Sequence, residues 1–226
     1  GAMSLPRGDT NYRGGRDRGL FGGGYATLNT IEFITISTLG NTKDFGDLNV
    51  GRRNQTSCSS EIRGVWSGGW NGSAIQNSID YVTIRSTGNA FDFGDLNQTT
   101  QLPTAFSNNI RGIMGGGSTP LVSDALDFIT FTSTGNAFAF GDLTLARQNL
   151  YAVASTTRGI VAGGLTPDRT EVIDYVTIAS TGDALDFGDC TAPKDGSAGI
   201  AGATRGIFTG GRAPGAVNTI EYITMA

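Results

Sequence analysis

Three short stretches decide the fold of this chain: RGVWSGG at residues 63–69, IDYVTI at residues 79–84 and FDFGDL at residues 91–96. The first is an apolar run that ends in a double glycine, which is typical of a strand closing in a tight turn. The second is rich in β-branched and aromatic residues, and the third is anchored by Phe93, so both are expected to be strands. The small residues 57–60, just before the first stretch, are expected to form a further, innermost strand.

This unit recurs along the whole chain. Its Arg-Gly pair is separated by intervals of 45, 48, 47 and 47 residues and begins at Arg18, Arg63, Arg111, Arg158 and Arg205. Four antiparallel strands in a unit of about 47 residues match one blade of a β-propeller. The second stretch is apolar on both faces, as expected when a sheet is covered on both sides. The sequence therefore predicts an all-β fold, a five-bladed β-propeller with four-stranded antiparallel blades.

The expected domain organisation is one propeller preceded by a short scar. Residues 1–3 (Gly-Ala-Met) are typical of a protease-cleavage scar from an expression tag, and residues 4–226 form the single five-bladed domain. The predicted blades span approximately residues 5–48, 49–96, 97–143, 144–190 and 191–226.

Only four units contain the FGD strand, and the fifth lacks it, so the last blade is either incomplete or closed by the N-terminus. An incomplete blade five would have three strands, or would result from a trimmed sequence. A blade five closed by the N-terminus would have its edge completed by residues 1–5. Closure is favoured because it leaves fewer strand edges. Residues 12–15 fall in the register of an innermost strand for blade one.

The repeat resembles the Kelch repeats, whose blades carry a hydrophobic strand that ends in Gly-Gly. It has Phe in FGD where Kelch repeats typically have Trp. The pattern RGI..GG....IEYITI.STGNA.DFGD is similar to repetitive Kelch-like segments in structural and tail-fibre proteins of large marine bacteriophages. This resemblance implies a virion structural protein, placed at the virion surface, but it specifies fold more than function because propellers host unrelated activities.

The sequence favours a protein that is not an enzyme. It contains no histidine, which removes the commonest general base and nearly all zinc and copper sites, so no metal or cofactor is expected. An acidic residue recurs in every unit, at Glu32, Asp80, Asp127, Asp174 and Glu221. An active site is asymmetric, so a residue that is present in every unit is not expected to be catalytic. We therefore expect these residues to cap turns or to pair with the repeated arginines. The repeated arginines have a second set of possible partners in Asp44, Asp92 and Asp186. The alternative is a glycoside hydrolase, which would need two carboxylates in distinct environments.

Composition limits the partners. The net charge of −4 argues against nucleic acid, which requires a basic face. No apolar stretch approaches the length of a membrane span. Cys58 and Cys190 belong to different units and are predicted to be too far apart for a disulfide.

The binding site is predicted where the units differ, in the loops after Gly-Gly. Tyr25 and Trp70 stand out there, and Asn71 and Asn77 lie near Trp70 in the sequence. An aromatic ring beside amides suits a sugar, whose C–H face stacks on the ring while its hydroxyls meet polar groups. The leading hypothesis is therefore lectin-like recognition of glycans or host-surface polysaccharide by a non-enzymatic propeller. Two alternatives remain: Trp70 packs on a neighbouring blade, or the protein is purely architectural and binds no small ligand.

Overall fold

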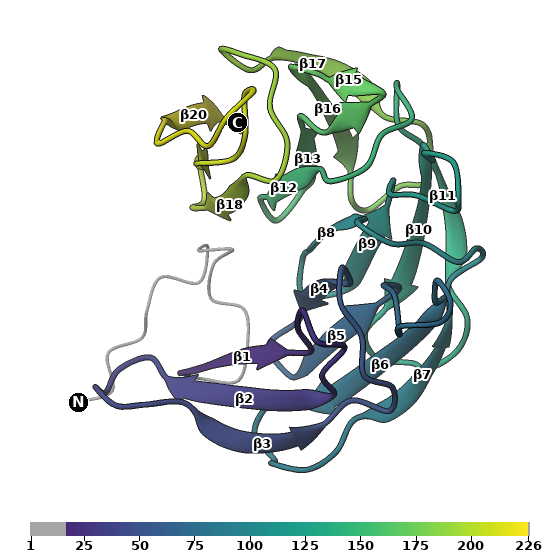
Figure 1. Cartoon of the computed structure of the whole chain (residues 1–226), viewed down its shortest axis with the longest axis vertical. Coiled ribbons are helices and arrows are strands. Elements are labelled where there is room, and N and C mark those ends of the chain that lie inside the picture. Colours follow the sequence, from purple (N-terminus) through teal and green to yellow (C-terminus); the bar gives the residue numbers. More distant parts are fainter. Residues whose placement is uncertain (1–16, 226) are drawn as a thin grey trace.

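The computed structural model describes residues 17–225, which form five antiparallel sheets arranged as blades around a common axis (Figure 1). Blade one contains β1 (Arg18–Gly22), β2 (Thr30–Thr35) and β3 (Lys43–Asp47). Blade two contains β4 (Thr56–Ser59), β5 (Arg63–Ser67), β6 (Ser78–Thr83) and β7 (Phe91–Asp95). Blade three contains β8 (Thr104–Ser107), β9 (Arg111–Gly115), β10 (Ala125–Thr130) and β11 (Phe138–Asp142).

The last two blades follow the same pattern. Blade four contains β12 (Tyr151–Ala154), β13 (Arg158–Ala162), β16 (Val172–Thr177) and β17 (Leu185–Asp189). A small hairpin of β14 (Leu165–Thr166) and β15 (Asp168–Arg169) lies in its loop. Blade five contains β18 (Ala198–Ala201), β19 (Arg205–Thr209) and β20 (Ile220–Thr224).

The predicted all-β, five-bladed propeller is confirmed, and blade five has three strands. Each complete blade follows the predicted order, with the small-residue strand innermost and the FGD strand outermost. The inner strands β4, β8, β12 and β18 lie side by side around the axis. The strands predicted for residues 1–5 and 12–15 lie outside the described residues.

Apolar side chains between neighbouring blades form the core. The cluster between blades two and three packs Val65, Ile79 and Phe93 against Met114 and Ile129. Similar clusters join blades one and two, three and four, and four and five. Each middle blade therefore buries both faces, which explains why its third strand is apolar on both sides. Within residues 17–225 no such cluster joins blade five to blade one.

Three of the repeated arginines, Arg18, Arg63 and Arg111, link neighbouring blades, which corrects the predicted pairing with the repeated acidic residues. Arg63 donates Nη1 to the backbone carbonyl of Phe131 in blade three, at 2.6 Å, and its guanidinium lies 4.5 Å from the ring centroid of Tyr81. The other four stack in the same way, over Phe33, Phe128, Tyr175 and Tyr222. Asp92 and Asp186 instead accept hydrogen bonds from the backbone N–H of nearby glycines.

The repeated acidic residues pair with a different set of cations. Asp80 contacts Arg52 at 2.6 Å, Asp174 contacts Arg147 at 2.9 Å, and Glu221 contacts Lys194 at 2.6 Å. In blades two to four each aspartate sits at a β-bulge, a device that re-aims a side chain out of the regular pleat. Blade three has Thr100 at the position of the cation, and Asp127 accepts hydrogen bonds from the backbone and side chain of Asn97.

Candidate binding face

The loops after Gly-Gly form one rim of the propeller, on which each junction between blades carries different side chains. Isolated β-bridges occupy equivalent positions within blades two to five, beside the junction with the preceding blade, and pair Arg53 with Trp70, Gln101 with Ser118, Gln148 with Leu165 and Asp195 with Arg212. We call these four pairs the loop rim. Its backbone is repeated while its chemistry changes from junction to junction, so a binding site that uses it can be specific to one junction.

The first junction brings Tyr25 and Trp70 next to the same residue, Arg53. The backbone of Arg53 exchanges two hydrogen bonds with that of Trp70, at 3.0 and 2.8 Å. The Arg53 guanidinium lies 5.3 Å from the ring centroid of Tyr25, within the range of a cation–π contact. Tyr25 is 87% exposed, and Trp70 is half-buried. Two loops of different blades therefore each place an aromatic residue next to Arg53.

The two asparagines are less favourably placed. The side-chain oxygen of Asn71 accepts hydrogen bonds from the backbone N–H groups of Ser73 and Ala74, at 2.9 and 2.8 Å. This turn leaves the Asn71 amide nitrogen, rather than its oxygen, to meet a ligand. Asn77 is half-buried just before β6, and its backbone carbonyl accepts from the N–H of Leu96. Within residues 17–225 no hydrogen bond joins the Asn77 side chain to Tyr25 or Trp70.

Arg53 is the residue of this junction that the sequence analysis missed. It lies before β4, outside the loops that follow Gly-Gly, so the comparison of those loops did not include it. A signal was present, because the equivalent residues are Gln101, Gln148 and Asp195, which makes Arg53 the cation of this series. In the part of the chain that the structure describes, Arg53 forms no salt bridge, and its Nε is buried without a hydrogen-bond partner.

At the last junction of the loop rim, unlike at Arg53, the charged side chain has hydrogen-bond partners. The buried carboxylate of Asp195 accepts hydrogen bonds from Arg169 in the β14–β15 hairpin, from Arg212 at 2.7 Å and from Asn149. Burial by itself would raise the pKa of Asp195, but these three donors outweigh it and hold the pKa below its ordinary value. Asp195 therefore ties the loops of blades four and five together.

We expect this network to make the protein acid-sensitive. Because the folded-state pKa of Asp195 is depressed, its contribution to stability is present above the unfolded pKa of about 3.9 and is lost as pH falls through the folded pKa. Thermal unfolding between pH 6 and pH 2 should show a smaller loss of stability on acidification for Asp195→Asn than for the wild type. Asp168→Asn, which removes an exposed carboxylate of the same hairpin, should keep the wild-type profile. Parallel profiles for the wild type and Asp195→Asn would contradict this role.

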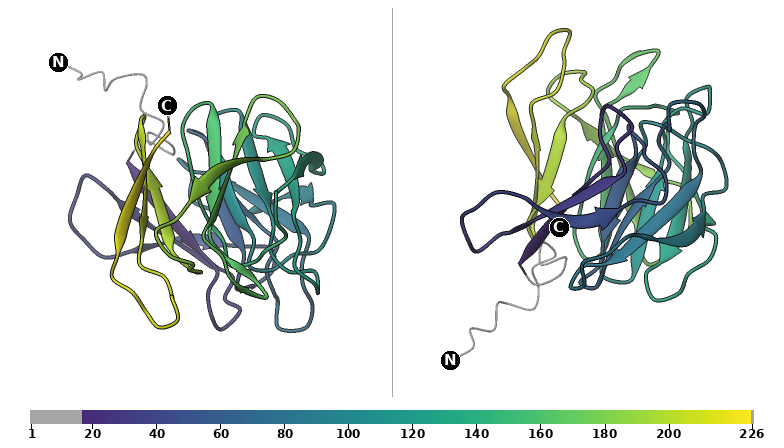
Figure 2. Two further views of the ribbon diagram at one scale, coloured as in Figure 1. Left: turned by 90° about the horizontal axis from the view of Figure 1, so that it is seen from above. Right: turned by 60° about the horizontal axis from the view of Figure 1, so that its bottom comes forward.

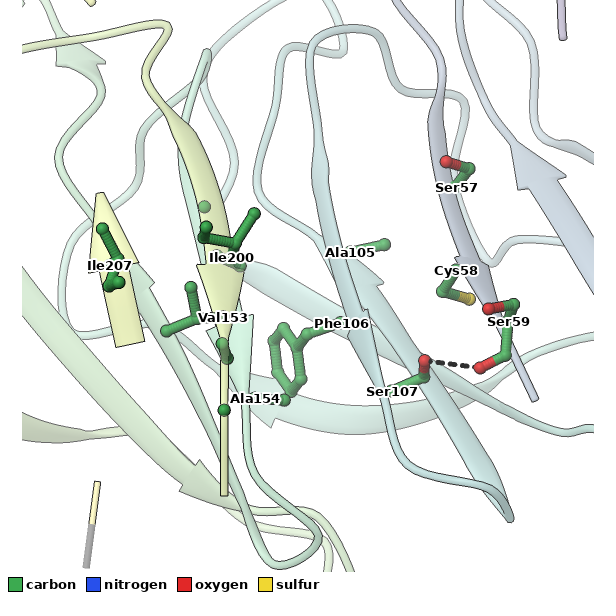
Figure 3. Close-up of a pocket in the computed structure, with 14 residues that line it drawn as sticks. Ser57, Cys58, Ser59, Ala105, Phe106, Ser107, Val153, Ala154, Ile200 and Ile207 are labelled. Carbon is green, nitrogen blue, oxygen red and sulfur yellow. Dashed lines mark hydrogen bonds between the residues drawn. The ribbon is translucent and has the colours of Figure 1, made fainter. Parts of the chain in front are cut away.

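A central cavity of about 630 Å³ lies between the inner strands (Figure 3). Its lining is made of small and apolar residues, including Ser57, Ser107, Phe106 and Ile200. The hydroxyl of Ser107 donates to the backbone carbonyl of Ser59 at 2.9 Å, linking the inner strands of two blades. The lining residues, taken from the described part of the chain, include no carboxylate. The glycoside hydrolase alternative would require two carboxylates at its site.

Other chemical features of the described residues are few. Residues 17–225 contain no group of three or more histidine, cysteine, aspartate or glutamate residues close enough to share a metal ion. Cys58 and Cys190 form no disulfide, and the Cys190 thiol lies 3.3 Å from the Tyr151 hydroxyl inside the protein. No helix in the described region is long and apolar enough to cross a membrane.

The fold and the loop rim are thus the features from which function can be argued. A propeller by itself does not specify an activity, because the same scaffold carries unrelated sites. No protein-family model matches the sequence, and no curated protein is significantly similar to it.

Proposed function

We propose that this chain is a non-enzymatic binding module, a propeller of a phage virion such as a tail fibre, that recognises glycans of a host-surface polysaccharide. The observation that carries the proposal is the meeting of Tyr25 and Trp70 at Arg53 on the loop rim. The virion assignment is supported by the similarity of the repeat to the Kelch-like segments of phage structural proteins.

The Tyr25 ring has the properties of a sugar-binding plate. It is large and exposed, and the Arg53 guanidinium lies beside it. Because this contact already restrains the ring, little further side-chain entropy is lost when a ligand stacks on it. The Arg53 guanidinium, 5.3 Å from the centroid of the Tyr25 ring, and the amide nitrogen of Asn71, the residue after Trp70, are hydrogen-bond donors suited to the hydroxyl or carboxylate oxygens of a saccharide. The half-buried Trp70 gives the junction a second aromatic wall.

The test is a glycan array of bacterial-surface oligosaccharides, with affinities then measured by calorimetry. Tyr25→Ala and Trp70→Ala should each weaken binding at least about 10-fold, since removing a central aromatic contact typically costs 2 kcal/mol or more. Arg53→Gln introduces the residue that blades three and four carry at this position, and it should weaken binding less than Tyr25→Ala.

The matched control is Leu121→Ala, which removes an exposed apolar side chain from the corresponding loop of blade three and should leave affinity unchanged. A protein that binds no glycan, or binds one with an affinity indifferent to Tyr25 and Trp70, would overturn the proposed site. Turnover of a reporter glycoside, abolished by a single Asp or Glu substitution, would overturn the non-enzymatic assignment.

A further inference from the structure

Asn71 and Gly72, in the loop between β5 and β6, are the one Asn-Gly pair of the sequence. An asparagine can react with its own backbone, because the nitrogen of the next residue can close a five-membered ring onto the side-chain carbon Cγ. That attack expels the side-chain nitrogen as ammonia and leaves a cyclic imide. Glycine at the next position favours the reaction, since it has no side chain to crowd the nitrogen and restricts the backbone least.

The attacking nitrogen of Gly72 is accessible in the folded protein. The loop lies at an end of its blade, where the connections between strands project beyond the sheets (Figure 2). Gly72 is exposed, and the atom nearest to the position of a Cβ on it is Cγ2 of Thr27, 3.8 Å away. Among residues 17–225 its backbone N–H donates no hydrogen bond to another backbone group. The nucleophile therefore has neither a backbone partner nor a steric barrier.

The turn also activates the carbon that is attacked. Oδ1 of Asn71 accepts the backbone N–H groups of Ser73 and Ala74. Negative charge develops on this oxygen as the nitrogen of Gly72 attacks, and two donors aimed at it stabilise that charge as an oxyanion hole does. The same two hydrogen bonds use the oxygen of the side chain and leave its nitrogen, the leaving group, to depart into solvent.

Asn108 has the same turn but lacks the other two features. Its Oδ1 accepts the backbone N–H groups of Ile110 and Arg111, at 2.9 and 2.8 Å. The next residue is Asn109, whose side chain crowds the attacking nitrogen. Nδ2 of Asn108 donates to the carbonyl of Thr156 at 3.1 Å, which retains the leaving group. Asn108 is therefore an internal reference for a polarised carbonyl alone.

Asp195 and Gly196 show the opposite case, in which the sequence suits the reaction and the fold prevents it. An aspartate can form the same imide with loss of water. The N–H of Gly196, however, donates to the carbonyl of Asn149 at 3.0 Å, so the nucleophile is engaged. The carboxylate of Asp195 is buried and held by its three donors. We expect this pair to react only when the chain is unfolded.

We propose that Asn71 is a site of self-modification, at which the folded protein converts an amide into a carboxylate. The nitrogen of Gly72 forms a bond to Cγ of Asn71, the bond from Cγ to the side-chain nitrogen breaks, and the Gly72 proton leaves with the ammonia. Water then opens the imide. Opening at one carbonyl gives aspartate, and opening at the other gives isoaspartate, in which the backbone runs through the former side chain.

The modification changes the charge of the first junction of the loop rim. Three loops meet there, and together they contain two arginines and no carboxylate: residues 23–29, 48–55 and 68–77. The product carboxylate lies on the residue after Trp70, whose backbone is bridged to Arg53. The reaction thus adds a negative charge to this junction and removes the Asn71 amide donor. It requires no ligand, so the inference is independent of glycan recognition.

Peptide mapping by mass spectrometry tests the proposal on the full chain, incubated in mildly alkaline buffer with water labelled by heavy oxygen. Asn71 should convert and incorporate the label at least about 10-fold faster than Asn108. Asp195 should isomerise in urea and not in the folded protein, which checks that the folded sample is intact. Equal rates at Asn71 and Asn108, or an Asn71 that converts in urea but stays an amide in the folded protein, would overturn the proposal.

Two variants test the role of the next residue. Gly72→Ala adds a methyl group beside the nitrogen and should slow conversion of Asn71 at least about 10-fold. The φ of Gly72 is +97°, so the fold of this variant is checked by thermal unfolding. Asn109→Gly gives Asn108 a following glycine and should speed its conversion, although less than to the rate of Asn71 because Thr156 still retains the leaving group. An unchanged rate in either variant would contradict the mechanism.

Discussion

Asp174→Ala is expected to lower the free energy of unfolding by about 3–5 kcal/mol, because it leaves a guanidinium buried without its counter-charge. The ion pair between Arg147 and Asp174 has no solvent exposure on either side chain, and its atoms lie 2.9 Å apart. Burial lowers the pKa of Arg147 and the carboxylate opposes that shift, so removing the carboxylate leaves the desolvation cost uncompensated. Urea unfolding monitored by fluorescence gives the free energy.

Blade three provides the matched control. Asp127 occupies the same position as Asp174, but Thr100 replaces the cation and Asn97 supplies the hydrogen bonds. Asp127→Ala removes a buried acceptor without orphaning a buried charge, so its cost should be about 1–3 kcal/mol. Equal losses for the two variants would show that the ion pair adds nothing beyond its hydrogen bonds.

The second large effect is expected for Gly94→Ala, in the FGD motif of blade two. Gly94 has φ +142°, a conformation that side chains rarely adopt, and a Cβ there would collide with the backbone of Gly135 and Asn136 in blade three. The obstructing atoms are backbone, so they cannot rotate away. Adding the backbone cost to the overpacking cost, we expect a loss of about 3–5 kcal/mol in urea unfolding.

Gly188, the glycine of the FGD motif in blade four, separates the backbone cost from the overpacking cost. Gly188 has a similar φ of +133°, but nothing lies within 4 Å of the position of its Cβ. Gly188→Ala should therefore lose only the backbone contribution, about 1–3 kcal/mol. If Gly188→Ala were as damaging as Gly94→Ala, the close approach of the next blade would not be the reason for glycine in this motif.

The repeated residues position neighbouring blades and strands. Gly94 makes room for the neighbouring blade, and the arginine of each Arg-Gly pair lies over an aromatic ring of its own blade. Such residues serve the scaffold, which is why they recur in unit after unit. The loop rim is free of that constraint, since its bridges use backbone atoms and leave side chains such as Arg53 and Trp70 to vary.

The sequence by itself determined the number of blades and the order of strands within them, whereas the three strands of blade five were one of several forms that it left open. These features are local, because strand patterns, turns and the spacing of the Arg-Gly pairs can be counted along the chain. The same local contrast between loops identified Tyr25 and Trp70 as unusual. Their ligand remains a proposal that rests on chemistry rather than on pattern.

Only the tertiary structure decided which residues meet. Arg63 donates to a carbonyl of the next blade, and Asp174 pairs with Arg147. The residues equivalent to Arg147 in the other blades are Arg52, Thr100 and Lys194, so the sequence shows no repeating pattern at this position. Arg53 likewise reaches Tyr25 only because the ring places blade two beside the loop of blade one. Such contacts depend on how blades are placed around the axis, and that placement follows from packing between sheets, which no local stretch of sequence contains.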